Sequence, residues 1–286
     1  MDQPNTEQKR QNPLSQWFRQ PKIYIRLPSK GEFYPAGALD KSANEEYAVY
    51  AMTAKDELMF KTPDALLSGQ TTVEVIKSCI PAILNPWTMP SVDLDAALIA
   101  IRIATYGEGM DVTANCPFCD YENDYEINLV SWLEKVSGFN FETEINIDPL
   151  TIHIRPYTYK EVTEASLKTF EQQRIIAIVN DENLSDELKI EKFSESFVKL
   201  TELTVDTMAK CIWKISTPAG DVTNLEDILE FIQNSPKDVF QRISDHISKL
   251  KDKVALGEQE VACKECEKEF RMPIELDQSS FFGNRS

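Results

Sequence analysis

Two stretches of the sequence decide how this chain folds: CPFCDYENDYEINL, from Cys116 to Leu129, and CKECEKEFRMPIEL, from Cys263 to Leu276. Both begin with C-x-x-C, and they agree again at Glu122/Glu269, Ile127/Ile274 and Leu129/Leu276. Twelve free positions at average amino-acid usage would give roughly one identity by chance. Three identities therefore favour one structural unit that occurs twice.

Each stretch has the pattern of a zinc-binding hairpin, which is a strand, a C-x-x-C turn and a returning strand. MDVTAN (110–115) and DYEINL (124–129) flank the first turn, and EQEVA (258–262) and EFRMPIEL (269–276) flank the second. One turn directs two thiolates at one ion, and two turns supply the four ligands of a tetrahedral zinc site, with Zn–S bonds of about 2.3 Å. We therefore predict one structural zinc ion, held by the four cysteines of both turns: Cys116, Cys119, Cys263 and Cys266.

The separation of the two turns is unusual for such a site. A zinc ribbon normally has roughly 15–20 residues between its C-x-x-C pairs, whereas 143 residues lie between Cys119 and Cys263. One shared site remains feasible because the entropic cost of closing a loop grows only logarithmically with its length. Two alternatives stay open: each turn binds metal in a different molecule, or the cysteines carry no metal.

Two other chemistries use the C-x-x-C motif. Rubredoxin-like proteins bind iron with similar turns, but they usually carry glycine directly after the second cysteine. Asp120 and Glu267 stand there in this chain, which favours zinc. A thiol oxidoreductase needs the motif at the N-terminus of a helix, where the helix dipole lowers the thiol pKa. Neither motif begins a helical pattern, so the redox interpretation is disfavoured.

The composition argues against several classes of protein. The 286 residues include 47 acidic and 30 basic side chains, which gives a net charge of −17. Because nucleic-acid affinity depends on Lys and Arg, this charge disfavours a zinc-ribbon nucleic-acid-binding module and also an anionic membrane surface. The most apolar stretch, AALIAIRIA (96–104), is too short to span a membrane and contains Arg102, so it predicts a buried helix. No secretion signal is recognisable, and cysteines kept reduced in a cytoplasm point to metal rather than disulfides.

We expect an α+β fold in which small sheets and helices mix, with a discontinuous zinc-ribbon-like unit formed by the two C-x-x-C hairpins. The length predicts about two domains. Four segments are expected along the chain: a flexible N-terminal arm (1–21), an N-terminal α+β region that ends in the first zinc hairpin (22–129), a strand pair with a mainly helical insertion (130–257), and the second zinc hairpin with a C-terminal tail (258–286).

The sequence holds no catalytic signature: G-x-S-x-G, a glycine-rich phosphate loop and H-E-x-x-H are all missing. Carboxylate pairs such as Asp56/Glu57 and Asp93/Asp95 have the positions of helix caps and solvated faces. Neither histidine has a partner at metal-ligand or triad spacing, and the remaining cysteines, on apolar helical faces, are expected in the core: Cys79 and Cys211. We therefore predict a protein that is not an enzyme and has no small-molecule substrate.

Aromatic pairs stand near both ends of the sequence. Trp17 and Phe18 belong to LSQWF (14–18) in an otherwise polar segment, and Phe281 and Phe282 belong to SSFFGNRS (279–286). One or two aromatic side chains can supply most of the binding free energy of a short segment. We predict that these four residues bind partner proteins. For Trp17 and Phe18, the alternative is that they fold back onto the core of this chain.

Several longer stretches carry a resemblance to a known family. They are NPLSQWFRQPKIYIRLPSKGEFYPAG (12–37), YAVYAMTAKDELMFKTPDALLSGQ (47–70) and VIKSCIPAILNPWTMPSVDLDAALIAIRIATYGEGMDV (75–112), followed by CPFC. Residues up to about 130 resemble the baseplate hub subunit and hub-assembly proteins of T-even-type contractile-tailed bacteriophages, and the second C-x-x-C with FFG fits more loosely.

The resemblance implies a non-enzymatic protein that helps to build the tail hub in the cytoplasm of the infected host cell. Its expected partners are other baseplate hub or tail proteins. Members of the family differ in whether they stay in the baseplate of the finished virion, so that point stays open.

Overall fold

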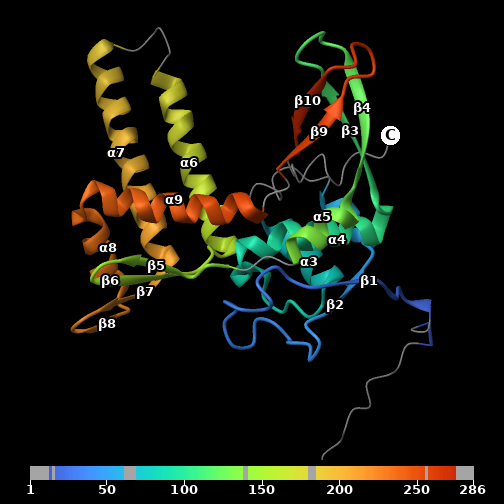
Figure 1. Ribbon diagram of the computed structural model, residues 1–286, viewed down its shortest axis with the longest axis horizontal. Helices are drawn as coiled ribbons and strands as arrows, with labels where there is room; N and C mark the ends of the chain where they lie inside the picture. The colour runs from blue at the N-terminus through green and yellow to red at the C-terminus, as the bar shows by residue number, and fades with distance from the viewer. Residues whose placement is uncertain are drawn as a thin grey trace, which may run out of the picture.

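A computed structural model of the chain describes residues 13–14, 17–60, 69–137, 141–179, 185–254 and 257–274. Within these residues the fold is mixed, with small antiparallel sheets and helices arranged around two separate apolar cores. Two hairpins stand side by side above the first core, and two long helices project from the second core in the same general direction (Figure 1).

The first core surrounds helix α4 (Ser91–Tyr106), which contains the predicted buried stretch AALIAIRIA. Leu98, Ile99 and Ile101 are all fully buried, and each contributes about 1.5–3 kcal/mol relative to an exposed position. The elements packed around α4 are the antiparallel strands β1 (Pro21–Ile25) and β2 (Tyr47–Tyr50) and helices α1 (Ala54–Phe60), α3 (Gln70–Cys79) and α5 (Leu129–Ser137). The short helix η2 (Pro86–Thr88) contacts α3. The prediction of a buried helix is confirmed.

A buried carboxylate at the start of α4 corrects one expectation. Asp93 was predicted to be a cap or part of a solvated face, but it is fully buried. Its Oδ1 accepts a hydrogen bond from the Ser29 amide (2.8 Å), and its Oδ2 accepts from the hydroxyls of Ser29 (2.6 Å) and Tyr34 (3.0 Å). Burial raises the pKa of Asp93 to about 6, although these hydrogen bonds act in the opposite direction. The prediction fails because the loop that holds the three donors is 59 to 64 residues away in sequence.

Asp56, in contrast, caps helix α1 as predicted. The Thr53 amide donates to Oδ2 of Asp56 (2.8 Å), and the Asp56 amide donates to the Thr53 hydroxyl (3.3 Å), which is the reciprocal pattern of a capping box. The carboxylate is nevertheless buried rather than solvated. The guanidinium of Arg19 lies 3.6 Å from it and supplies the compensating charge.

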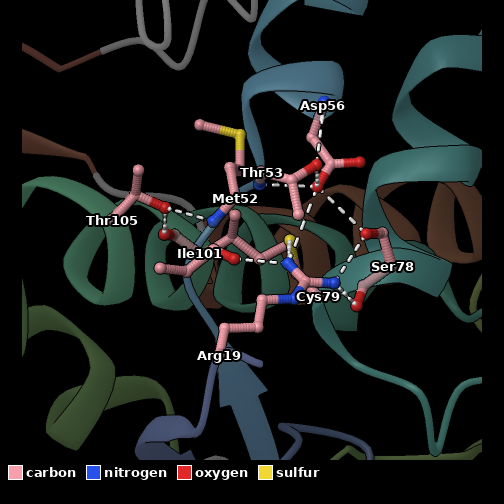
Figure 2. A network of polar contacts seen from close by, with 9 residues as sticks. Arg19, Met52, Thr53, Asp56, Ser78, Cys79, Ile101 and Thr105 are labelled. Atoms are coloured by element: carbon pink, nitrogen blue, oxygen red, sulfur yellow. Dashed lines mark hydrogen bonds and ion pairs between the residues drawn. The ribbon is translucent and has the colours of Figure 1, made fainter. Parts of the chain in front are cut away.

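Arg19 ties the segment before β1 to the first core (Figure 2). Its guanidinium donates to the carbonyl of Ala51, and to the carbonyl (2.5 Å) and hydroxyl (2.7 Å) of Ser78. Directly before this anchor, the side chains of Trp17 and Phe18 are 77% and 56% exposed. These two aromatic side chains therefore do not pack on the core of this chain.

The second core lies between a four-stranded antiparallel sheet and three helices that cover one of its faces (Figure 1). Its apolar side chains include Ile152, Ile154 and Ile215 from the sheet and Met208 and Ile228 from the helices. The strands are β5 (Glu144–Ile147), β6 (Leu150–Ile154), β7 (Ile212–Thr217) and β8 (Gly220–Val222), and the helices are α7 (Asp186–Cys211), α8 (Leu225–Asn234) and α9 (Lys237–Val254).

Helix α6 (Tyr159–Val179) connects the two cores and pairs with α7. At its first residue, the ring of Tyr159 stacks on Trp87 with 5.5 Å between the ring centroids, and its amide donates to the Met89 carbonyl (2.8 Å). Among the described helices, none is both long enough and apolar enough to cross a bilayer.

Candidate metal centre

The two C-x-x-C motifs form the tips of two antiparallel hairpins. Strands β3 (Gly109–Asn115) and β4 (Glu122–Asn128) form the first, and strands β9 (Glu258–Ala262) and β10 (Glu269–Pro273) form the second. Both hairpins stand on the first core, where Met110, Ile127 and Met272 are buried together. The predicted strand–turn–strand units are therefore present, and they lie side by side (Figure 1).

The two turns have the same backbone geometry. In the first, the Cys116 amide donates to the Tyr121 carbonyl (2.9 Å), and the Asp120 amide donates to the Cys116 carbonyl (2.9 Å). The corresponding bonds of the second turn, from Cys263 to Lys268 and from Glu267 to Cys263, are both 3.0 Å. The repeat seen in the sequence is thus a repeat in structure.

The residues after the second cysteines, Asp120 and Glu267, adopt left-handed φ values of 59° and 58°. This conformation costs a residue with a side chain about 1–2 kcal/mol, yet the turn adopts it without glycine. The lack of glycine therefore does not separate zinc from iron, and the sequence argument for zinc at this point loses its weight.

The four cysteine sulfurs form a compact group. All four Sγ atoms lie within 4.8 Å of one another, with Cys116 to Cys266 at 3.7 Å and Cys119 to Cys263 at 3.6 Å. Four sulfurs that surround one zinc ion at about 2.3 Å are about 3.8 Å apart, which is the edge of the tetrahedron. A disulfide would need about 2.05 Å. The spacing suits a metal ion shared by both turns.

Hydrogen bonds from the backbone orient the first thiol of each turn. The Phe118 amide points at Sγ of Cys116, and the Glu265 amide points at Sγ of Cys263, both at 3.4 Å. Cys116 and Cys263 are buried, whereas Cys119 is exposed. The two turns therefore fix Cys116 and Cys263 on the inner side of the group, and the outer side is open to solvent at Cys119.

The thiols differ in their ease of ionisation. The amides of Cys266 and Glu265 lower the pKa of Cys263 to about 6. The Tyr121 amide acts in the same direction on the exposed Cys119, but local desolvation within the cysteine group and hydrogen bonds with the other three thiols outweigh it and raise the pKa of Cys119 to about 12. Four thiolates this close repel one another, so full ionisation requires a cation among them.

Asn123 connects the two turns and was not predicted. It is buried on β4, where its Nδ2 donates to the Tyr121 carbonyl (2.9 Å) and lies 3.6 Å from Sγ of Cys263. Its Oδ1 accepts the Lys264 amide (2.8 Å). One side chain thus binds both hairpins and one of the four sulfurs, in the way that residues behind metal ligands orient them.

Further contacts join the hairpins below the turns. The Tyr125 hydroxyl donates to the Ala262 carbonyl (3.0 Å), and the Tyr125 ring meets Phe270 edge to face at 6.2 Å. The Lys264 ammonium donates to the Asp124 carbonyl (2.6 Å). The hairpins are therefore packed together by side chains as well as by the cysteine group.

The other candidate residues lie elsewhere. Cys79 and Cys211 are buried in the cores, as predicted, and do not belong to the cysteine group. Each C-x-x-C motif lies between two strands, so the helix start that a thiol oxidoreductase needs is not at either motif. Trp17 and Phe18 are on the surface of the first core, and Phe281 and Phe282 lie outside the described residues.

Comparison with known families decides what kind of protein carries this fold. The family model described as "T4 bacteriophage base plate protein" matches residues 20–283, which include both cysteine motifs and both cores. The chain belongs to the T4-type phage baseplate protein family. No curated protein and no solved structure matches it.

This membership confirms the resemblance to proteins of the T-even phage baseplate. It covers the helical region between the motifs as well as the N-terminal part. Membership of this family implies that the chain contacts other phage structural proteins.

Proposed function

We propose that this chain is a non-enzymatic component or assembly factor of the phage baseplate hub, and that one structural zinc ion joins its two hairpins. The main support for the zinc site is the spacing of four sulfurs on two turns of the same geometry: those of Cys116, Cys119, Cys263 and Cys266. Four thiolates fill the coordination sphere of zinc and leave no position for water. Such an ion stabilises a fold and does not catalyse. In this proposal the two hairpins together form a zinc ribbon whose halves are distant in the sequence.

Support for the hub role comes from the residues up to about 130, which resemble hub and hub-assembly proteins. The proposed partners are other hub or tail proteins, met in the host cytoplasm during assembly. Trp17 and Phe18 are suited to contact them because they are exposed directly beside the Arg19 anchor. Phe281 and Phe282 are proposed as a second contact.

Metal analysis of protein purified under reducing conditions tests the zinc site. We expect one zinc ion per chain, and loss of that ion in Cys263→Ser, because three thiolates no longer complete the tetrahedron. Cys79→Ser makes the same change at a buried cysteine outside the group and should keep the ion. Iron in place of zinc, or a full metal content in Cys263→Ser, would contradict the proposal.

Purification of the tagged chain from infected cells tests the hub role. The wild-type chain should travel with proteins of the central hub, and a Trp17→Ala/Phe18→Ala variant should lose them while keeping its melting temperature, since both side chains are exposed. Co-purification with proteins of the outer baseplate alone would contradict the hub role. It would not bear on the proposed zinc site.

A further inference from the structure

The two hairpins are separate two-stranded sheets on the first core (Figure 1), so each of their strands has one edge without a partner strand among the described residues. In an antiparallel pair, alternate residues of a strand turn their amide and carbonyl groups toward the partner, and the residues between them turn these groups outward. Outward groups that are left free can pair with another extended chain. The edges of the sheets therefore show where such a chain could bind.

Three of the four hairpin edges are occupied or interrupted. At β4, the outward carbonyl of Asp124 accepts a hydrogen bond from the Lys264 ammonium (2.6 Å). At β9, the outward carbonyl of Ala262 accepts one from the Tyr125 hydroxyl (3.0 Å). Strand β10 has Pro273 at an outward position, where proline supplies no amide hydrogen.

The edges of the four-stranded sheet are blocked as well. At and directly before β5, the outward carbonyls of Asn146 and Glu142 accept hydrogen bonds from two side chains of α9, those of Arg242 (2.7 Å) and His246 (3.0 Å). The opposite edge is β8, which has only three residues. Covering by a helix and short edge strands are two ways in which proteins prevent the addition of a further strand.

The edge of β3 has no such protection. The Cys116 amide bonds to the Tyr121 carbonyl at the turn, so the residues of β3 that point outward are the alternate ones: Gly109, Asp111, Thr113 and Asn115. All four positions are exposed, and no hydrogen bond among the described residues uses their outward backbone groups. With seven residues, β3 offers a longer edge than the blocked strands of the four-stranded sheet.

The exposed face beside this edge is acidic. The β4 residues that pair with Asp111, Thr113 and Asn115 share that face, and all three are exposed carboxylates: Glu126, Asp124 and Glu122. Within the described ranges, no ion pair involves any of the three. The Glu126 carboxylate lies across Gly109, with Oε1 2.6 Å from the position that a β-carbon would take there. Asp111 adds a fourth carboxylate, whose charge Arg102 of α4 partly offsets.

A second copy of this chain fits the edge poorly. If two β3 strands paired antiparallel about a two-fold axis perpendicular to the sheet, the acidic faces of both copies would lie on the same side of the joined sheet. Like charges on neighbouring strands are destabilising. A chain with basic side chains is the better complement.

We propose that β3 binds an extended segment of another protein, which adds to the first hairpin as a third strand and carries Lys or Arg at alternate positions beside Glu122, Asp124 and Glu126. In this mode of recognition main-chain hydrogen bonds give affinity and alternate side chains give specificity. Opposite charges on neighbouring strands stabilise the pairing. The proposal rests on the function proposed above, in which the chain acts through protein contacts, and it states the chemistry of one partner.

Three fluorescent peptides of the length of β3 test the proposal with the full chain. Threonine alternates with lysine in the first and with glutamate in the second. The third is the lysine peptide with N-methylated backbone amides, which cannot donate to a strand. Fluorescence anisotropy should show that the first peptide binds at least about tenfold more tightly than either of the others. Equal binding of the two lysine peptides would overturn the proposal, because it would show attraction to an acidic surface without strand pairing.

Two substitutions at one position separate the edge from its side chain. Thr113→Pro removes an outward amide hydrogen but no hydrogen bond between β3 and β4, and it should weaken binding of the lysine peptide at least about tenfold. Thr113→Val keeps the amide hydrogen and should bind like the wild type. Unchanged binding by Thr113→Pro would overturn the proposal.

Glu122→Lys/Glu126→Lys should reverse the preference between the lysine and glutamate peptides, and it keeps the test decisive if Thr113→Pro does not fold. A preference that stays the same in this variant would overturn the proposal. Zinc content and melting temperature are measured on the same samples, so a failure of the metal site is recognised separately from a failure of this contact.

Amide hydrogen exchange measured by NMR locates the contact. The amides of Asp111, Thr113 and Asn115 should exchange rapidly in the free chain and slowly after addition of the lysine peptide. The outward amides of Glu122 and Glu126 on β4 should not change. Slow exchange of the β3 amides in a free monomer would show that the chain's own residues occupy the edge, and a wild-type dimer that Thr113→Pro converts to a monomer would show that a second copy does. Either result would overturn the proposal.

Discussion

Asn123 and Asp93 are buried polar side chains, and each holds together segments that are far apart in the sequence. Asn123 makes its contacts across 140 positions, and Asp93 across 64. A buried polar group without partners costs about 1–3 kcal/mol, so each of these residues requires the surrounding segments to keep one arrangement.

Asn123→Asp should weaken the affinity for zinc by about 10- to 100-fold, as is typical when a residue behind a metal ligand is changed. The aspartate keeps the acceptor for the Lys264 amide but loses the donor toward Cys263 and adds a negative charge beside the thiolates. Competition with a chelator measures the affinity. Asn115→Asp, an exposed position on the adjacent strand, should leave the affinity unchanged, and an equal loss in both variants would show that charge alone is responsible.

Asp93→Asn should change how the free energy of unfolding depends on pH. The pKa of Asp93 is raised to about 6 in the folded chain from an ordinary 3.8. The folded state therefore binds more protons between these values, and this residue's contribution to stability falls as pH rises through that window. Relative to Asp93→Asn, the wild type should lose about 1.4 kcal/mol between pH 5 and pH 7.5. Urea unfolding at both pH values measures the difference, and a difference that is independent of pH would show that Asp93 is not in its neutral form at pH 5.

The four cysteines could be predicted as one group because their spacing is dictated by the chemistry of the turn. Asn123 could have been suspected from the same comparison, since the matching position of the second stretch is Phe270, but a polar residue in a strand does not reveal its partner. The burial of Asp93 could not be predicted at all. Its donors come from a loop whose path depends on the packing of α4, and no local pattern encodes that contact.

At the scale of elements, prediction succeeded where a local signal marks both ends of an element. The hairpins around the cysteines and the buried helix α4 have such signals. Strand β7 has no such signal at its start. Its first residue, Ile212, directly follows Cys211, the last residue of α7, and no glycine or proline marks the boundary. The segment becomes a strand because it pairs with β6, as Ile215 does with Ile152, and this long-range pairing overrides the helical pattern that precedes it.

The segment before β1 is a second case in which a long-range contact decides an element. Arg19→Ala should lower the free energy of unfolding by about 1–3 kcal/mol, because the buried Asp56 carboxylate and the Ser78 carbonyl lose a charged donor. Arg26→Ala is the control. Its ion pair with Glu46 is exposed on both sides, so the loss there should stay within about 1 kcal/mol. Urea unfolding compares the two, and equal losses would show that the Arg19 network does not stabilise the fold.

At the scale of the whole molecule, the two cores are built differently. The first joins elements from both sides of the helical region, since Met272 of β10 packs with Met110 and Ile127 of the first hairpin. The second uses only residues between Phe141 and Leu250. The proposed metal site therefore adjoins only the first core.

Removal of zinc should loosen the hairpins and leave the second core intact. We expect hydrogen exchange to accelerate in β3, β4, β9 and β10 after chelation under reducing conditions, because the ion no longer opposes the repulsion of the thiolates. The packing of Tyr125 on Phe270 should keep the two hairpins in contact. Exchange in β6, β7 and α8 should not change. Accelerated exchange throughout the chain would show that the two cores unfold as one unit.

The pairing of the two hairpins also sets an order of events on the ribosome. The first hairpin leaves the ribosome with two thiols and with Asn123 uncovered, and its counterpart is made only after α6, α7, α8 and α9 have been translated. The first C-x-x-C turn therefore lacks the second one during the entire time in which the helical region is translated. Until Cys266 emerges, that half-site can take up a metal ion only weakly or share it with another molecule.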